Sequence, residues 1–246
     1  MCSDKRVWAG DPFSLTPVGR VHSIFKKKFG IPRQAGIIPE ATATIELLAP
    51  FNNEQMVRGL EGFSHVWVLF VFHDSAAEGW KTTVRPPRLG GQKKVGVFAS
   101  RSPFRPNPIG MSAVELEEIS FRKGKVFLHV KGVDLLHDTP VIDIKPYLPY
   151  SDSLSHAAGG YAQEPPGRKF DIHFSCEAEK MITLEEENGV CGLRSLIVKM
   201  LAGDPRPAYY LPRHSKARFA ITLMNLDIKW SLEGDRIVVN EVVKLK

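Results

Sequence analysis

The chain has 246 residues, of which 43% are hydrophobic and 24% charged, so it is long enough for one sizeable core and a small second unit. Its formal net charge of +6 favours polyanionic partners such as RNA. Three cysteines without CxxC spacing predict neither a disulfide framework nor a zinc site, and no apolar run approaches the roughly 20 residues that span a bilayer. Because the N-terminus also lacks the apolar segment of a signal peptide, we expect a cytoplasmic protein that binds no metal.

The first half of the chain reads mainly as strands. Residues 17–25 and 41–48 alternate apolar and polar positions, which predicts two strands. Residues 53–60 have helical spacing, with Asn52 or Asn53 as the cap. Residues 64–72 form a continuous apolar run, which favours a buried central strand and makes His65 a core histidine.

Residues 95–98, 112–119 and 125–130 are further β-prone segments, which brings the count to six or seven short strands before residue 150. This pattern favours a β-barrel or sandwich. No GxGxxG follows a first strand, so a doubly wound α/β fold has no support in the sequence. We therefore predict a mainly β protein with a compact barrel at residues 1–155.

Beyond residue 150 the composition changes. Residues 150–168 are rich in small residues, glycine and proline and predict a linker. The segments that follow predict a strand, a helix and a hairpin around Gly234 and Asp235; they are residues 170–176, 193–201, 219–230 and 236–243. We expect residues 156–246 to form the linker and a small α+β domain.

Residues 95–111 change from a β-prone run into a loop with three prolines, Arg101, Arg105 and Asn107. Each proline fixes its own φ and restricts the residue before it, so the loop is extended and stiff. Such a loop can hold guanidinium and amide groups ready for an anionic ligand. A solvated surface connection explains the same composition.

Two shorter stretches carry polar groups in similar places. His73 and Asp74 follow directly on the apolar run, where a strand end delivers side chains to a site or a histidine simply binds backbone. Asp143 and Lys145 alternate with isoleucines, which indicates either a functional strand or an exposed face with a paired surface charge.

Six motifs occur in an order that resembles the TrmO family, also called TsaA-like or VirR-like proteins. They are GIPRQAG at 30–36, FSHVWVLFVFHD at 63–74, RPPRLGG at 85–91, VGVFASRSPFRPNPIGM at 95–111, DTPVIDIKPYLP at 138–149 and GDPRPAYY at 203–210. The resemblance covers residues 18–150 and continues into the C-terminal part. It implies a compact β-barrel, S-adenosylmethionine-dependent methylation of tRNA at N6 of N6-threonylcarbamoyladenosine beside the anticodon, and a homodimer.

By the same resemblance, residues at several motifs are expected to bind the cofactor S-adenosylmethionine. They are Pro32, Arg33, Gln34, His73, Asp74, Arg101, Met111, Asp138, Thr139, Pro140 and Val141. Arg33 or Arg101 can pair with the methionine carboxylate, and Asp74 or Asp138 can take the ammonium or a ribose hydroxyl.

The acceptor base carries its own carboxylate, for which Arg105 is the expected partner, and Asn107 is expected to bind the ureido group or a base edge. The N6 proton must also leave, and His73, Tyr147 or, in last place, Lys145 can accept it. The RNA surface is expected to use basic side chains and a stacking aromatic, namely Lys26, Lys27, Lys28, Lys93, Lys94, Arg206 and Tyr209.

Two other classes of function compete with the methyltransferase. A non-catalytic RNA-binding barrel would use the same basic surface without the cofactor. A small-molecule hydrolase would use His73 and Asp74, but no GxSxG, HExxH or catalytic-cysteine motif accompanies that pair.

Overall fold

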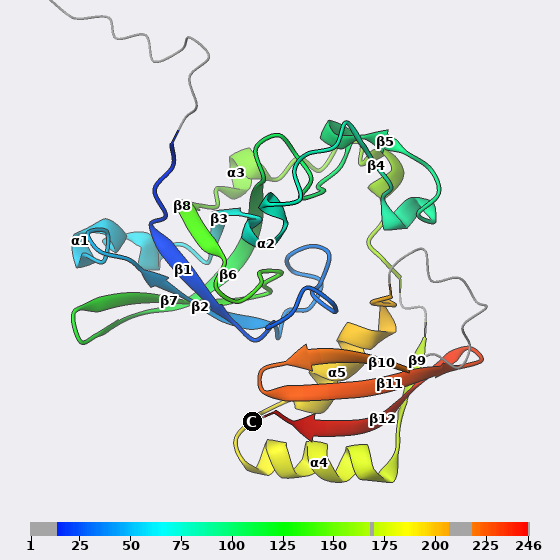
Figure 1. Ribbon diagram of the computed structural model, residues 1–246. Helices are drawn as coiled ribbons and strands as arrows, with labels where there is room; N and C mark the ends of the chain where they lie inside the picture. The colour runs from blue at the N-terminus through cyan, green and yellow to red at the C-terminus, as the bar shows by residue number, and fades with distance from the viewer. Residues whose placement is uncertain (1–13, 168–169, 207–217, 246) are drawn as a thin grey trace, which may run out of the picture.

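The structure is a computed structural model that describes residues 14–167, 170–206 and 218–245. Figure 1 shows two units, a β-barrel in blue to green and a C-terminal unit in yellow to red. Among the described residues no helix is long and apolar enough to cross a membrane. The expected cytoplasmic location remains a prediction.

Six of the described strands close the barrel in the order β1-β2-β7-β6-β3-β8, and each neighbouring pair is antiparallel. Their bounds are β1 Gly19–Ser23, β2 Thr42–Leu47, β3 His65–Val71, β6 Ile109–Arg122, β7 Lys125–Lys131 and β8 Pro140–Pro146. The predicted mainly β architecture is therefore confirmed, because these six strands form a closed antiparallel barrel.

The barrel core consists of the alternate side chains that point inward. Val21, Ile45, Val68, Leu128 and Val141 are fully buried there. In β3 only every second residue is buried, and His65 is exposed. The prediction of a strand buried on both faces, with a core histidine, was wrong because a closed antiparallel barrel encloses only one face of each strand.

Short elements connect the barrel strands. The helix α1 spans Glu54–Val57 and is capped by Asn53, whose side chain accepts a hydrogen bond from the Gln55 backbone N–H. The other elements are η1 Leu60–Gly62, α2 His73–Ala76, β4 Thr83–Val84, η2 Pro87–Leu89, β5 Val95–Gly96 and η3 Val97–Ala99. The two-residue strands β4 and β5 pair with each other and stand apart from the barrel in Figure 1.

The segment 138–147 turns at its start. Asp138 has a φ of 62°, and the chain then runs straight into β8. The predicted linker contains α3 Pro149–Asp152 and η4 Gly160–Ala162.

The C-terminal unit is a four-stranded sheet with two helices. The sheet order is β10-β11-β12-β9, with β9 parallel to β12. The elements are β9 Asp171–Phe174, α4 Cys176–Glu187, α5 Leu193–Ala202, β10 Arg218–Leu223, β11 Leu226–Glu233 and β12 Arg236–Lys244.

Two features of this unit differ from the expectation. The segment 219–230 is two strands, because the chain turns at Met224, which has a φ of 55°. Helix α4 was not predicted, although Ser175 caps it by accepting a hydrogen bond from Ala178 N–H at 3.1 Å and acidic residues fill its first turn.

The two units share one continuous core. Phe25, which is 1% exposed, forms a bridge with Leu223, and the Met224 N–H donates to the Ile24 carbonyl at 2.7 Å. Both Phe25 and Leu223 belong to the hydrophobic cluster that runs through the barrel and the C-terminal sheet.

Candidate active site

A cavity of about 680 Å³ opens at one side of the barrel. Its walls come from the loop after β1, the end of β3 with α2, the loop before β6, the start of β6 and the loop between β7 and β8. They include Lys28, Pro32, Arg33, Gln34, Phe72, His73, Asp74, Arg101, Phe104, Arg105, Gly110, Met111, Ser112, Asp134 and Thr139.

Pairing between β3 and β6 explains why motifs far apart in the sequence meet here. Val71 lies opposite Ile109, and the Phe72 N–H donates to the Pro108 carbonyl at 2.8 Å. The polar residues that follow β3 therefore lie beside the residues that precede β6. His73 and Met111 reach the same cavity for this reason.

Gly110 on β6 leaves room for the ring of Phe70, which lies opposite it on β3. A Cβ built at Gly110 would lie 2.3 Å from Cζ of Phe70 and 2.5 Å from its Cε2. Phe70 in turn packs edge-on against Phe72, with ring centroids 5.1 Å apart. The absence of a side chain at Gly110 thus makes room for an aromatic wall next to the cavity.

The proline-rich loop is held together by its own arginine. Nη1 of Arg105 donates to the carbonyl oxygens of Ser100 and Ser102, at 2.8 and 3.5 Å. Ser100 Oγ donates to the Val97 carbonyl at 2.8 Å. These bonds leave the charge of Arg105 unneutralised, because its partners are neutral carbonyls.

Arg101 of the same loop donates to Oε1 of Gln34, so the loop is joined to residues 32–34, the PRQ segment. Arg33 of that segment donates to the Arg206 carbonyl at 3.4 Å and connects the cavity with the C-terminal unit. Burial is the main cause that lowers the pKa of Arg33. The charge of Asp204 opposes this effect, and the charge of Arg88 adds to it. Guanidinium groups thus gather on this side of the cavity.

Asp74 of α2 and Glu78, which follows that helix, face a lysine that lines the same cavity. Lys28 Nζ lies 2.9 Å from Asp74 Oδ2 and 3.7 Å from Glu78 Oε1. The hydrogen bond from Lys28 holds the pKa of Asp74 below its usual range. Lys28, expected on an RNA surface, therefore lines the cavity and is paired there.

Asp134 is a cavity residue that the sequence analysis did not single out. Its Oδ1 accepts a hydrogen bond from Ser112 Oγ at 2.6 Å, and burial raises its pKa. One aspartate in a short apolar segment carries no local signal of a site. It lies next to β6 because it follows β7, which pairs with β6 in an antiparallel hairpin where Glu115 lies opposite Lys131.

Several residues expected at the site do not line this cavity. Val141 is fully buried inside the barrel, Pro140 lies opposite Arg20 on β1, and Asp138 points outward. Tyr147 packs on the outer face of the barrel against Trp67, with ring centroids 5.6 Å apart. Asn107 lies in the proline-rich loop without facing the cavity.

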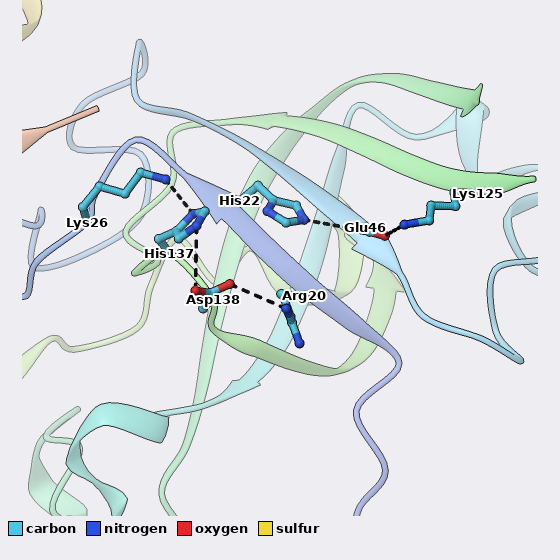
Figure 2. A network of polar contacts seen from close by, with 7 residues as sticks. All are labelled: Arg20, His22, Lys26, Glu46, Lys125, His137 and Asp138. Atoms are coloured by element: carbon cyan, nitrogen blue, oxygen red, sulfur yellow. Dashed lines mark hydrogen bonds and ion pairs between the residues drawn. The ribbon is translucent and has the colours of Figure 1, made fainter. Parts of the chain in front are cut away.

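Figure 2 shows the polar network that surrounds Asp138 on the outside of the barrel. Asp138 lies 3.9 Å from Arg20 and 3.8 Å from His137. Lys26 Nζ donates to His137 Nδ1 at 2.9 Å, which requires a neutral imidazole. Burial, followed by the charge of Lys26, lowers the pKa of His137 and so favours that form.

The other basic side chains expected to meet RNA are dispersed. Lys27, Lys93 and Lys94 are exposed, and Arg206 is paired with Asp204 at 2.7 Å. Tyr209 lies outside the described residues. Within residues 14–167, 170–206 and 218–245 no group of three or more histidine, cysteine, aspartate or glutamate side chains is placed to hold a metal ion.

Family models identify both units. Residues 20–153 match the tRNA-methyltransferase O N-terminal domain and residues 167–245 match the TrmO C-terminal domain. The chain belongs to the TrmO family. The resemblance read from the six motifs is therefore confirmed.

TrmO relatives resemble the chain over most of its length. It is 46% identical to the tRNA (adenine(37)-N6)-methyltransferase of Escherichia coli K12, over 89% of this chain and 92% of that one. It is 43% identical to a putative S-adenosylmethionine-dependent methyltransferase of Pseudomonas aeruginosa, over 88% of this chain and 91% of that one.

The fold agrees with TrmO structures. The crystal structure of TrmO from Pseudomonas aeruginosa superimposes with a TM-score of 0.76 at 36% identity, over 95% of this chain and 99% of that one. The barrel and the C-terminal unit are thus both features of the TrmO fold.

Proposed function

We propose that this protein is an S-adenosylmethionine-dependent tRNA methyltransferase that methylates N6 of N6-threonylcarbamoyladenosine at position 37. The observation that carries this proposal is the convergence of the PRQ, His-Asp and proline-loop motifs on one cavity of a TrmO barrel. The high identity to a tRNA (adenine(37)-N6)-methyltransferase supports the same reaction.

The residues of the cavity fit the chemical groups of S-adenosylmethionine. Arg33 and Arg101 can bind the carboxylate of the methionine part, and the carboxylate of Asp74 can bind its ammonium group. Phe72 and Met111 offer apolar surface for the adenine ring and the sulfonium. When bound, this cofactor supplies an electrophilic methyl group on a positively charged sulfur.

The chain contributes mainly by positioning. Methyl transfer needs the acceptor nitrogen held in line with the methyl group and water kept out, so neither a metal nor a nucleophilic side chain is required. The stiff loop that carries Arg105 suits this task, because its backbone is tied by its own hydrogen bonds.

Arg105 is the proposed partner of the threonyl carboxylate of the acceptor, since it lines the cavity and its hydrogen bonds go to neutral carbonyls. Asn107 of the same loop is proposed to contact the ureido group or the base as the tRNA docks. Lys26, Lys27, Lys93, Lys94 and Arg206 are proposed as phosphate contacts of the anticodon arm. The homodimer remains a prediction from the resemblance.

The decisive experiment measures transfer of a labelled methyl group from S-adenosylmethionine to two tRNA preparations, one with and one without the threonylcarbamoyl modification. We expect label in the modified tRNA alone. Cofactor binding without transfer to either tRNA would refute the proposed substrate. Tight RNA binding without any cofactor binding would favour the non-catalytic RNA-binding barrel instead.

A further inference from the structure

Asp134 stands in the cavity wall and has no role in the proposal above. It lies in the loop between β7 and β8, is partly buried and lines the cavity. Ser112, which is 3% exposed, donates its hydroxyl hydrogen to Oδ1 of Asp134 at 2.6 Å. Because Ser112 is held by β6 next to Met111, it fixes the orientation of the carboxylate at the cavity surface.

Burial is the main influence of the surroundings on the pKa of Asp134. Burial raises its pKa above the usual range, and this effect outweighs the hydrogen bond from Ser112, the backbone N–H groups of Asp134 and Ala35, and the charge of Arg101. A general base works best when its pKa approaches the pH at which the enzyme operates. Burial therefore moves Asp134 towards the range that a proton acceptor needs.

The other two carboxylates that line the cavity are less suited to accept a proton. Asp74 and Glu78 both face Lys28, and the bond from Lys28 lowers the pKa of Asp74. The groups that donate to Asp134 are instead neutral, namely the Ser112 hydroxyl and the backbone N–H groups of Asp134 and Ala35. The charged and titratable groups that share the cavity with Asp134 are Lys28, Arg33, His73, Asp74, Glu78, Arg101 and Arg105.

We propose that Asp134 is the catalytic base of the proposed reaction and accepts the proton that N6 loses on methylation. This inference rests on the proposed function. The N6 lone pair forms the new nitrogen–carbon bond, while the sulfur–carbon bond breaks and its electron pair stays on sulfur. The N6–H bond breaks with its pair remaining on nitrogen, and the proton passes to the Asp134 carboxylate.

The first test compares Asp134→Asn with the unmutated protein and with Asp143→Asn, a control on the outer face of β8 where Asp143 pairs with Lys145 at 2.6 Å. Loss of a general base costs about 10²- to 10⁴-fold in rate. We expect Asp134→Asn to lower the single-turnover rate on modified tRNA by that factor. Calorimetry should give an unchanged dissociation constant for S-adenosylmethionine in all three proteins.

The pH dependence separates a base from a structural residue. The rate of the unmutated protein should rise with pH through an ionisation above the usual aspartate range, and Asp134→Asn should lack this rise. Ser112→Ala removes a donor that stabilises the ionised carboxylate, so the rise should move to higher pH. Carboxyl NMR of the free proteins should show that Ser112→Ala raises the pKa of Asp134, and this measurement requires no turnover.

Two results would each overturn the role of Asp134. The first is a rate in Asp134→Asn equal to that of the unmutated protein. The second is a rise in the dissociation constant of S-adenosylmethionine by the same factor as the fall in rate. The second would make Asp134 a cofactor ligand. If the unmutated protein transfers no methyl group to modified tRNA, the proposed function fails first and the role of Asp134 falls with it. A thermal melt of each variant verifies that it is folded.

Discussion

Gly110 is a position in the cavity wall that has no room for a side chain. The Cβ of an alanine there would approach Cζ of Phe70 to 2.3 Å, and Phe70 is 5% exposed and packed against Phe72. Because a rigid ring inside a barrel cannot move away at low cost, the aromatic wall must shift.

We predict that Gly110→Ala lowers the free energy of unfolding by about 1–3 kcal/mol and weakens S-adenosylmethionine binding, because the displaced ring narrows the cavity. Denaturant unfolding and calorimetry measure the two effects. Gly96→Ala is the control, since Gly96 has a φ of −58° and nothing within 4 Å of an added Cβ. Equal stability of the two variants would contradict the steric argument.

Residue chemistry was readable from the sequence, but the partner of each residue was not. The prolines and arginines of residues 101–108 indicated a stiff cationic loop, and the structure contains such a loop. The pairing of Lys28 with Asp74 and the hydrogen bond from Ser112 to Asp134 join segments 46 and 22 residues apart. No local pattern encodes such pairs, because they arise only when the strands meet.

At the scale of elements, three neighbouring strands of the barrel are tied by one carboxylate. Glu46 on β2 lies 2.8 Å from Nε2 of His22 on β1 and 2.6 Å from Nζ of Lys125 on β7 (Figure 2). The hydrogen bond from Lys125, followed by that from His22, holds the pKa of Glu46 below its usual range. The ionised form of Glu46 is thus favoured by folding.

A carboxyl group with a depressed folded pKa stabilises the protein above its unfolded pKa, and this stabilisation disappears as the pH falls through the folded value. We predict that Glu46→Gln lowers the free energy of unfolding by up to about 1 kcal/mol at neutral pH, as expected of ion pairs whose His22 and Lys125 side chains are exposed.

Urea unfolding at a series of decreasing pH values checks this prediction. The difference between Glu46→Gln and the unmutated protein should shrink and vanish once Glu46 is protonated. Glu61→Gln, an exposed side chain in η1, serves as the control and should show little change. A difference that stays constant down to acid pH would rule out the ion pairs as its cause.

At the scale of the whole molecule, the barrel and the C-terminal unit meet through apolar side chains. Phe25 enters this shared core from the segment after β1, next to Leu223 on β10. Replacement of a buried phenylalanine by alanine leaves a cavity and lowers the free energy of unfolding by about 3–5 kcal/mol. The two units should therefore unfold together as long as this contact is intact.

We predict that Phe25→Ala lowers the unfolding free energy by about 3–5 kcal/mol and separates one calorimetric transition into two. Phe98→Ala is the matched control, because the side chain of Phe98 is 79% exposed and its loss should cost little. A single transition in Phe25→Ala would mean that other contacts couple the two units.

The sequence by itself determined the fold class, the family and most of the strands, because alternation, turn residues and ordered motifs are local properties of the chain. Only the tertiary structure decided which side of each strand is buried, which motif residues share the cavity, and that Asp134 joins them. Val141 shows the limit most clearly: it lies in a family motif, yet its side chain is buried in the barrel core and does not line the cavity. Side-chain direction depends on strand register and barrel closure, and both are set by contacts between residues distant in sequence.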